Sequence, residues 1–288
     1  MSYNQPNISV CAQWNTSGKQ IISRRLLGAQ PNTLFVHKNN TIYAAGLTGG
    51  RILEWHDDNS SLSRSVANIA GSLNNIFVTI DGTIYVDNSI NGTVEKLTVK
   101  AKESTVVMIV NSTCYGLFVD ISNNIYCSLA YERQIVKQSL IMGTNTFDIV
   151  ARDTGFCRTL CSPRGLFVDI NLDLYVADCS LHEIRRFKPG DKIGRAIVQT
   201  EKQSSFKLNC PVAVFLDIHK DIFIVDSSHE RIIRWNPNGF YCLLGCSQHE
   251  TLSYPRAAAF DSYGNIFVLN FNVQQIKKFE LIENIRRK

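Results

Sequence analysis

The chain has 288 residues, of which 44% are hydrophobic and 19% are charged, and its formal net charge is +5. This composition supports a hydrophobic core and excludes a disordered chain, while the length fits one large all-β domain. No segment approaches the roughly 18–20 consecutive apolar residues of a transmembrane helix. The positive charge is modest and spread along the sequence, so it does not indicate nucleic-acid binding, although it leaves that function open.

The first ten residues, MSYNQPNISV, contain neither the charged segment nor the apolar segment of a signal peptide. Nine cysteines are many for a protein of a reducing compartment. Six sequons for N-glycosylation point the same way, at Asn7, Asn15, Asn39, Asn59, Asn91 and Asn111. We therefore expect an extracellular glycoprotein or an ectodomain fragment whose signal lies outside this chain. A cytoplasmic location is the alternative.

Two short strand-like segments come first in chain order. Residues 8–14, ISVCAQW, have the pattern of a strand, but no partner for them is apparent. Residues 19–23, KQIIS, belong to the passage WNTSGKQII from Trp14, which resembles the passage WNPNGFYCL from Trp235. This likeness predicts that residues 19–23 form the last strand of a repeated unit.

Six similar units follow, at approximately residues 31–71, 73–112, 114–160, 163–206, 211–246 and 255–281. We take the Phe of the LFVD motif as the reference position, which is Phe35, Phe77, Phe118, Phe167, Phe215 and Ala259 in the six units. In every unit an aromatic residue stands eight positions later and a β-branched residue seventeen positions later. Fixed spacing within units and variable spacing between them indicates one supersecondary unit joined by loops of different length.

Each unit has the pattern of four antiparallel strands. A short apolar run comes first, and in four units an Asp follows it, at 120, 169, 217 and 261, where its side chain can bond to backbone N–H groups and start a turn. The next strand is rich in β-branched and aromatic residues. A period of 41 to 49 residues with four strands is typical of a β-propeller blade. We predict an all-β, six-bladed propeller forming a single domain, closed by residues 19–23, which complete the last blade.

The units resemble NHL repeats, whose pattern is Pro-x-Gly, an apolar-Val-Asp strand, a NIYVAD-like strand and an xRI strand. The passage SPRGLFVDINLDLYVADCSLHEIRRF matches almost throughout, and Pro31, Pro163, Pro211 and Pro255 occupy the Pro position. The resemblance implies the propeller fold but not one function, since NHL propellers serve several. One function that it implies is substrate recognition within a ubiquitin ligase, and some propellers of that group bind RNA.

The candidate binding site is the mouth of the central axis. Loops that enter the first strand of each blade share one face, the top face, with the loops between second and third strands. The residues three before the reference position are expected to ring the mouth: Asn32, Asn74, Tyr115, Arg164, Val212 and Arg256. Polar groups that converge on a concave opening make a binding site.

Six of the nine cysteines fall in top-face loops: Cys114, Cys157, Cys161, Cys179, Cys210 and Cys246. Antiparallel pairing of the first two strands of the fourth unit brings positions 161 and 179 together, so we predict a Cys161–Cys179 disulfide. Cys242 and Cys246 are expected to close a small loop. Cys127 replaces the Val of a YV pair and is expected to be a plain core residue.

A metal site is the alternative for the top face. The units also resemble the lyase domain of peptide-amidating enzymes, in which histidines surround a central metal. The candidate ligands here are His182, His229, His249, Asp178 and Asp226. The cysteine spacing does not fit a zinc finger, and motifs for a serine nucleophile or a phosphate loop are absent from the sequence. No cofactor is predicted.

Nineteen positions after the reference, a Lys or Arg recurs in five of the six units, and we expect these side chains to lie on a solvated strand face. Taken together, the sequence favours a non-enzymatic scaffold whose top loops bind a protein, peptide or glycan. A ubiquitin-ligase module and a metal-dependent lyase or hydrolase are the alternatives.

Overall fold

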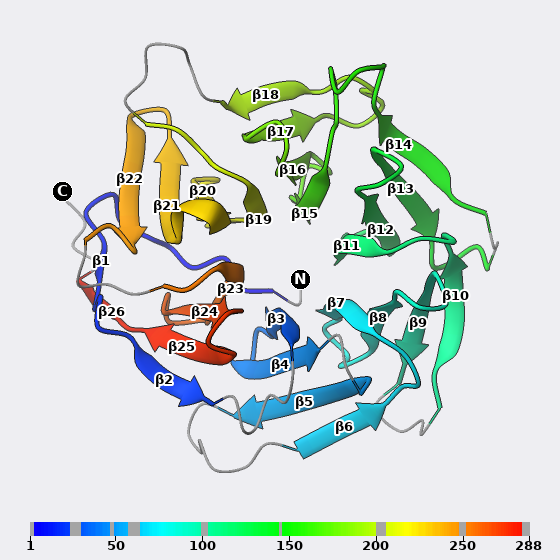
Figure 1. Cartoon of the computed structure of the whole chain (residues 1–288), viewed down its shortest axis with the longest axis horizontal. Helices are drawn as coiled ribbons and strands as arrows, with labels where there is room; N and C mark the ends of the chain where they lie inside the picture. The colour runs from blue at the N-terminus through cyan, green and yellow to red at the C-terminus, as the bar shows by residue number, and fades with distance from the viewer. Residues whose placement is uncertain are drawn as a thin grey trace.

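The computed structural model describes residues 3–23, 30–46, 49–56, 64–98, 103–143, 146–199, 206–247 and 252–283. Within these residues, six four-stranded antiparallel sheets surround a central axis, and a two-stranded sheet lies outside the ring (Figure 1). The protein is therefore a six-bladed β-propeller, as the repeat period predicts. The described residues contain one helical turn, η1 (Ser227–His229), and no helix among them is long and apolar enough to cross a membrane.

Each of the first three blades runs from an inner strand at the axis to an outer strand at the rim of the ring. Blade 1 consists of β3 (Pro31–Val36), β4 (Thr41–Gly46), β5 (Arg51–His56) and β6 (Arg64–Asn68). Blade 2 consists of β7 (Leu73–Val78), β8 (Ile84–Asn88), β9 (Thr93–Leu97) and β10 (Thr105–Ile109). Blade 3 consists of β11 (Cys114–Val119), β12 (Asn124–Leu129), β13 (Gln134–Ser139) and β14 (Asp148–Arg152).

The other three blades complete the ring. Blade 4 consists of β15 (Pro163–Val168), β16 (Leu174–Asp178), β17 (Glu183–Phe187) and β18 (Arg195–Val198). Blade 5 consists of β19 (Pro211–Leu216), β20 (Ile222–Asp226), β21 (Arg231–Asn236) and β22 (Gly239–Leu244). Blade 6 takes β23 (Pro255–Phe260), β24 (Ile266–Asn270) and β25 (Gln275–Phe279) from the end of the chain.

The N-terminal part of the chain closes the ring. Strand β2 (Lys19–Ile22) pairs antiparallel with β25, with Lys19 opposite Lys278 and Ile22 opposite Ile276, so it is the outer strand of blade 6. This confirms the closure predicted from the Trp14 passage. Strand β1 (Gln13–Trp14) pairs with β26 (Leu281–Glu283), so only the last two residues of the strand-like segment 8–14 form a strand, and its partner was not apparent in the sequence.

The repeat positions face one another across neighbouring strands. In all six blades the reference residue lies directly opposite the aromatic residue that stands eight positions later, as in the pair Phe118 and Tyr126. All eleven aromatic side chains at these two positions are buried. Fully burying one such side chain contributes roughly 1.5–3 kcal/mol, so this set is a large part of the core.

The predicted Asp turns are present at the bottom of the blades. The Oδ1 atom of Asp120 accepts N–H hydrogen bonds from Ser122 and Asn124, at 2.8 and 2.9 Å. Asp169, Asp217 and Asp261 accept the same pair of bonds in their own turns. Each carboxylate thus replaces water as the partner of two backbone N–H groups and fixes the connection between first and second strands.

Crowding at the axis explains the small residues on the inner strands. A Cβ atom at Gly116 would lie 2.4 Å from the carbonyl oxygen of Arg164 in the next blade. One at Gly165 would lie 2.6 Å from the Cα atom of Ala213. Because both contacts are to backbone, a side chain at either position requires neighbouring blades to move apart.

Candidate functional site

A cavity of about 260 Å³ lies along the central axis. All six residues predicted at the mouth line it: Asn32, Asn74, Tyr115, Arg164, Val212 and Arg256. Each residue comes from the inner strand of a different blade, so the rigid ring fixes the spacing between them. We call these six residues the rim of the cavity. Five of them are partly exposed and Asn74 is buried, so the rim lies at the boundary between solvent and the cavity.

One half of the rim is a chain of hydrogen bonds. The guanidinium of Arg256 donates through Nη1 to the Oδ1 atom of Asn32. The Nδ2 atom of Asn32 donates to the carbonyl oxygen of Asn74 at 3.0 Å and also to its Oδ1 atom. Asn74 in turn donates to the carbonyl oxygen of Cys114 at 2.8 Å. These bonds link the rims of blades 6, 1, 2 and 3 in sequence.

The other half of the rim is built on aromatic contacts. The guanidinium carbon of Arg164 lies 4.1 Å from the ring centroid of Tyr115, and that ring contacts Tyr131 with centroids 5.8 Å apart. The Nε atom of Arg164 is buried and has no hydrogen-bond partner among the described residues. Arg256 likewise stacks on Phe271, at 3.5 Å. Both guanidinium groups are therefore held by aromatic faces, which leaves N–H groups available.

The charge of the site is positive and uncompensated within its lining. Arg164 and Arg256 are its two charged side chains, and the described lining residues include no Asp or Glu. Burial lowers the pKa of Arg256 and the like charge of Arg164 acts in the same direction, whereas the phenols of Tyr254 and Tyr115 act against it. An anion at the mouth would relieve this repulsion.

Below the rim the wall of the cavity is largely aromatic. Its wall includes a belt of phenylalanine rings in which Phe35, Phe77, Phe118 and Phe167 follow one another with centroids 5.0–5.1 Å apart. The site therefore combines a polar, cationic opening with an aromatic interior.

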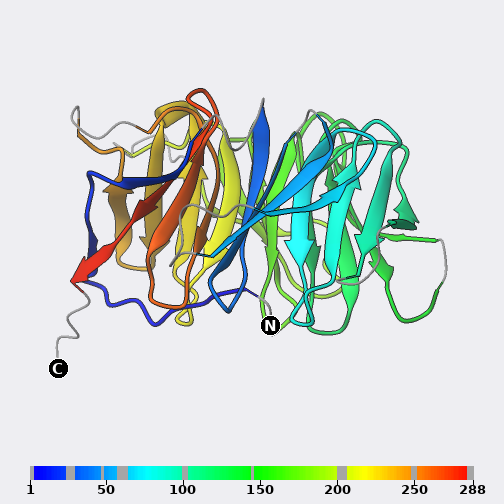
Figure 2. The same ribbon diagram turned by 90° about the horizontal axis from the view of Figure 1, so that it is seen from below.

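The N-terminal segment closes the bottom of the cavity. Tyr3 packs its ring against Phe118 and Phe167, at 5.2 and 5.1 Å, and its hydroxyl donates to the carbonyl oxygen of Val168. Asn4 donates to the carbonyl oxygens of His37 and Phe260, in two neighbouring blades. Figure 2 shows this segment in blue running beneath the blades towards the axis. The cavity is thus open at the top face and blocked at the bottom face.

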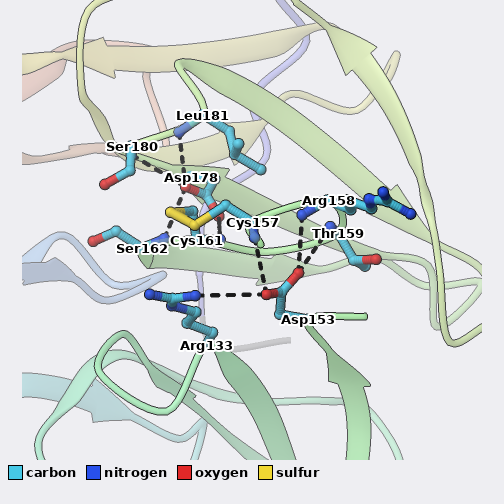
Figure 3. The surroundings of a disulfide bond; sticks show 10 residues. All are labelled: Arg133, Asp153, Cys157, Arg158, Thr159, Cys161, Ser162, Asp178, Ser180 and Leu181. Atoms are coloured by element: carbon cyan, nitrogen blue, oxygen red, sulfur yellow. Dashed lines mark hydrogen bonds and ion pairs between the residues drawn. A yellow bond between two sulfur atoms is a disulfide. The ribbon is translucent and has the colours of Figure 1, made fainter. Parts of the chain in front are cut away.

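Two exposed aromatic residues belong to top-face loops, and Tyr131 contacts the rim residue Tyr115. Tyr131, between β12 and β13, is 77% exposed, and Phe156, between β14 and β15, is 96% exposed. Phe156 precedes a small disulfide loop, Cys157–Cys161, whose backbone is held by two carboxylates (Figure 3). Asp153 accepts N–H bonds from residues 157, 158 and 159, and Asp178 accepts them from residues 161 and 162.

Four disulfides are present among the described residues: Cys114–Cys127, Cys157–Cys161, Cys179–Cys210 and Cys242–Cys246. They indicate an oxidising environment. The Cys242–Cys246 pair is as predicted. Cys127 is buried as expected but is not a plain core thiol, because it is bonded to Cys114.

The predicted Cys161–Cys179 disulfide is wrong. Antiparallel pairing does bring the backbones together, since the N–H of Cys179 donates to the carbonyl oxygen of Ser162 at 3.0 Å. However, Cys161 bonds within its own loop, and Cys179 bonds to Cys210 at the start of blade 5. The second disulfide therefore joins two blades instead of closing one hairpin.

The predicted metal-ligand candidates are already engaged with the protein. His229 lies 2.9 Å from the Oδ2 atom of Asp226, whose same oxygen also accepts from Arg231 at 2.8 Å. His182 accepts the N–H of Cys210, and Asp178 holds the disulfide loop. No group of three or more His, Cys, Asp or Glu side chains in the described ranges is arranged to hold a metal ion. His249 lies outside the described residues.

Sequence reasoning missed two parts of the site. Tyr3 and Asn4 lie outside the repeats, so their place beneath the axis has no periodic signal. Tyr131 and Phe156 lie in loops of variable length, where an aromatic residue among polar neighbours was the available sign.

A scan against protein families finds no match for the chain, and a search of curated proteins finds none either. Solved structures are similar in fold. A streptogramin B lyase structure is 11% identical over 91% of this chain and 97% of its own, with a TM-score of 0.64. An auxiliary nutrient binding protein from Bacteroides thetaiotaomicron is 13% identical over 98% and 76%, with a TM-score of 0.70.

The structure of a nidogen/laminin complex contains a chain that is 16% identical over 83% of this chain and 91% of its own, with a TM-score of 0.59. At such low identity these likenesses show the six-bladed propeller and not a shared function. The NHL family in particular is not shown by them, and that assignment stays a prediction.

Proposed function

We propose that this protein is a non-enzymatic binding scaffold whose top face, centred on the axial mouth, binds a protein, peptide or glycan. The observation that carries the proposal is the lining of the cavity. It joins two arginines and several amide and phenol side chains to an aromatic interior, in a hollow open at the top face. Convergent polar groups over an apolar pocket are typical of a ligand site.

The chemistry of the lining supports binding better than acid–base catalysis. Its described residues include no carboxylate, imidazole or free thiol, and the remaining titratable side chains are Arg and Tyr. Burial raises the pKa of Tyr115, as does its hydrogen bond with Tyr131, while the charge of Arg164 opposes the rise. Such groups hold and orient a ligand at neutral pH, whereas a general base works best with a pKa near the operating pH.

Preorganisation is the mechanism of binding. The rim residues are fixed by hydrogen bonds, aromatic stacking and the blades themselves, so little conformational entropy is lost when a ligand binds. The exposed rings of Tyr131 and Phe156 provide contact area on the top face, and aromatic side chains are enriched among residues that dominate binding energy. An extracellular or ectodomain location, with glycosylated sequons, forms part of this proposal.

The test is selection of ligands from a displayed peptide library and a glycan array, followed by titration calorimetry on the best binders. The informative variant is Tyr131→Ala, with Tyr263→Ala as matched control, because the two tyrosines are 77% and 73% exposed on opposite faces. We expect Tyr131→Ala to weaken binding at least tenfold and the control to change it less than twofold. Binders that depend equally on both residues, or only on Tyr263, would contradict a top-face site.

A further inference from the structure

We infer that the axial cavity takes the C-terminal residue of a peptide, with its carboxylate at the mouth between Arg164 and Arg256 and its apolar side chain in the aromatic interior. The inference rests on the proposed function, since it names the ligand of the same site. It is carried by the order of chemistry along the axis, which is cationic at the rim and apolar below it.

The positive charge of the rim favours an anionic ligand. Two guanidinium groups line one cavity whose described residues offer no carboxylate. Arginine presents its N–H groups in a fork that matches the two oxygens of a carboxylate, so a carboxylate satisfies these donors with the fewest atoms.

The fold orients both arginine side chains without using all of their hydrogen-bond donors. Arg164 stacks on Tyr115 and Arg256 stacks on Phe271, and Asn32 accepts one N–H of Arg256. Stacking orients a guanidinium through its face and leaves its edge for hydrogen bonds. Both groups are therefore set in place before a ligand arrives.

The interior selects an apolar group of limited size. The belt of phenylalanine rings offers no charged or amide partner, and Tyr3 blocks the far end. The volume of about 260 Å³ is below the roughly 300–1,000 Å³ of sites that enclose a whole drug-sized ligand. The cavity therefore encloses only part of a peptide. An internal Asp or Glu residue brings a carboxylate but leaves this apolar space unfilled.

A terminal residue meets both requirements at once. Its carboxylate and its side chain leave the same Cα atom, so one can remain at the rim while the other enters the cavity. The rest of the peptide then leaves over the top face, where Tyr131 and Phe156 are exposed. Capture of terminal carboxylates by fixed N–H groups is a known mode of peptide recognition.

The experiment compares four probes by titration calorimetry on the full chain. They are a hexapeptide ending in Leu with a free carboxylate, the same peptide as its C-terminal amide, a peptide with an internal Glu and an amidated end, and hexanoate. We expect the first to bind at least tenfold more tightly than each of the others. Equal binding by the amide or by the internal Glu peptide would overturn the inference. Equal binding by hexanoate would show that the site takes a carboxylate but not specifically a peptide. No binding of any probe at 1 mM (about −4 kcal/mol) would overturn both the carboxylate site and its peptide ligand.

Variants assign the contacts. Arg164→Gln and Arg256→Gln are each expected to weaken the free-carboxylate peptide at least tenfold, whereas Arg158→Gln, an exposed top-loop arginine outside the cavity, should change its affinity less than twofold. An unchanged affinity in both rim variants would overturn the inference. If either variant fails to fold, the comparison of acid and amide peptides on the wild-type protein still decides.

The same data separate this inference from the proposed function. Selected binders that depend on Tyr131 but show no preference for a free carboxylate would leave the top-face scaffold intact and reject the terminal-carboxylate site. Binders that ignore the top face would reject both.

Discussion

At the residue scale, the recurring basic position shows how packing modifies a periodic pattern. Nineteen residues after the reference, the Lys or Arg side chain lies directly opposite the buried aromatic residue of its own blade, as in Arg234 opposite Phe223. The predicted solvated face is therefore wrong in part, because Arg234 is buried and the other four are half-buried. Arg234 forms an ion pair with Asp221 and donates to the carbonyl oxygen of Ser9, so burial does not leave it unpaired.

Asp87 makes the stability of blade 2 depend on pH. Burial raises its pKa to about 7, against the lowering effect of hydrogen bonds from Cys114 and Ser89. The folded protein thus binds a proton that the unfolded chain releases above about pH 4, so the free energy of unfolding falls as pH rises from about 4 to 7.

We therefore expect Asp87→Asn to flatten this part of the profile, by an amount on the order of a few kcal/mol between pH 4 and 7. Urea unfolding of both proteins at pH 4, 5.5 and 7 measures it. Asp217, whose pKa burial raises to about 6, has the same sign and is present in both proteins, so it cancels in the comparison. Parallel profiles for the two proteins would show that folding does not raise the pKa of Asp87.

At the scale of the element, strands were predictable and cysteine pairing was not. The positions of Phe118, Tyr126 and Ile135 repeat at fixed spacing because each must face the same neighbours in every blade, so the sequence carries the strand register six times over. The partner of Cys179 depends instead on which way one loop side chain points. That direction is set by contacts with the next blade. These contacts are not repeated in the other blades, so the sequence offers no pattern from which to predict them.

The disulfide between Cys179 and Cys210 is expected to matter more for stability than the one between Cys242 and Cys246. It spans 31 residues and joins two blades, whereas the other spans four residues and joins β22 to the loop directly after it. Cross-linking a longer loop removes more entropy from the unfolded chain, roughly 3–4 kcal/mol against about 2 kcal/mol.

The measurement is urea unfolding, without reductant, of the double variants Cys179→Ser with Cys210→Ser and Cys242→Ser with Cys246→Ser. The first pair should lose more stability than the second. A larger loss from the second pair would mean that strain or local packing, and not loop closure, decides the contribution.

At the scale of the whole molecule, the number of blades and the closure of the ring followed from sequence. The likeness between the passages at Trp14 and Trp235 identified β2 because both passages lead into the outer strand of a blade. The segment before it could not be placed. Its residues, Asn4 and Gln5 among them, contact the bottom turns of several blades. These contacts occur once in the chain, so they leave no periodic signal in the sequence.

Closure predicts a strong effect of one side chain in β2. Ile22 is fully buried in a cluster with residues of blades 1 and 6, while its neighbour Ile21 is only partly buried. We expect Ile22→Ala to cost about 2–5 kcal/mol, because a cavity is left in the cluster between blades 1 and 6. Ile21→Ala, the matched control, should cost clearly less. Similar losses in urea unfolding would mean that β2 does not carry the closure through its buried face.

Tyr3 and Asn4 lie across the bottom of the axial cavity, so within the described part of the chain the cavity opens at the top face. Whatever occupies it must depart by the route through which it arrived, and the water it displaces must leave by that route too. Residence time is therefore governed at one end of the molecule. Attachment of the protein to a surface from the side of Tyr3 would leave that opening facing the solution.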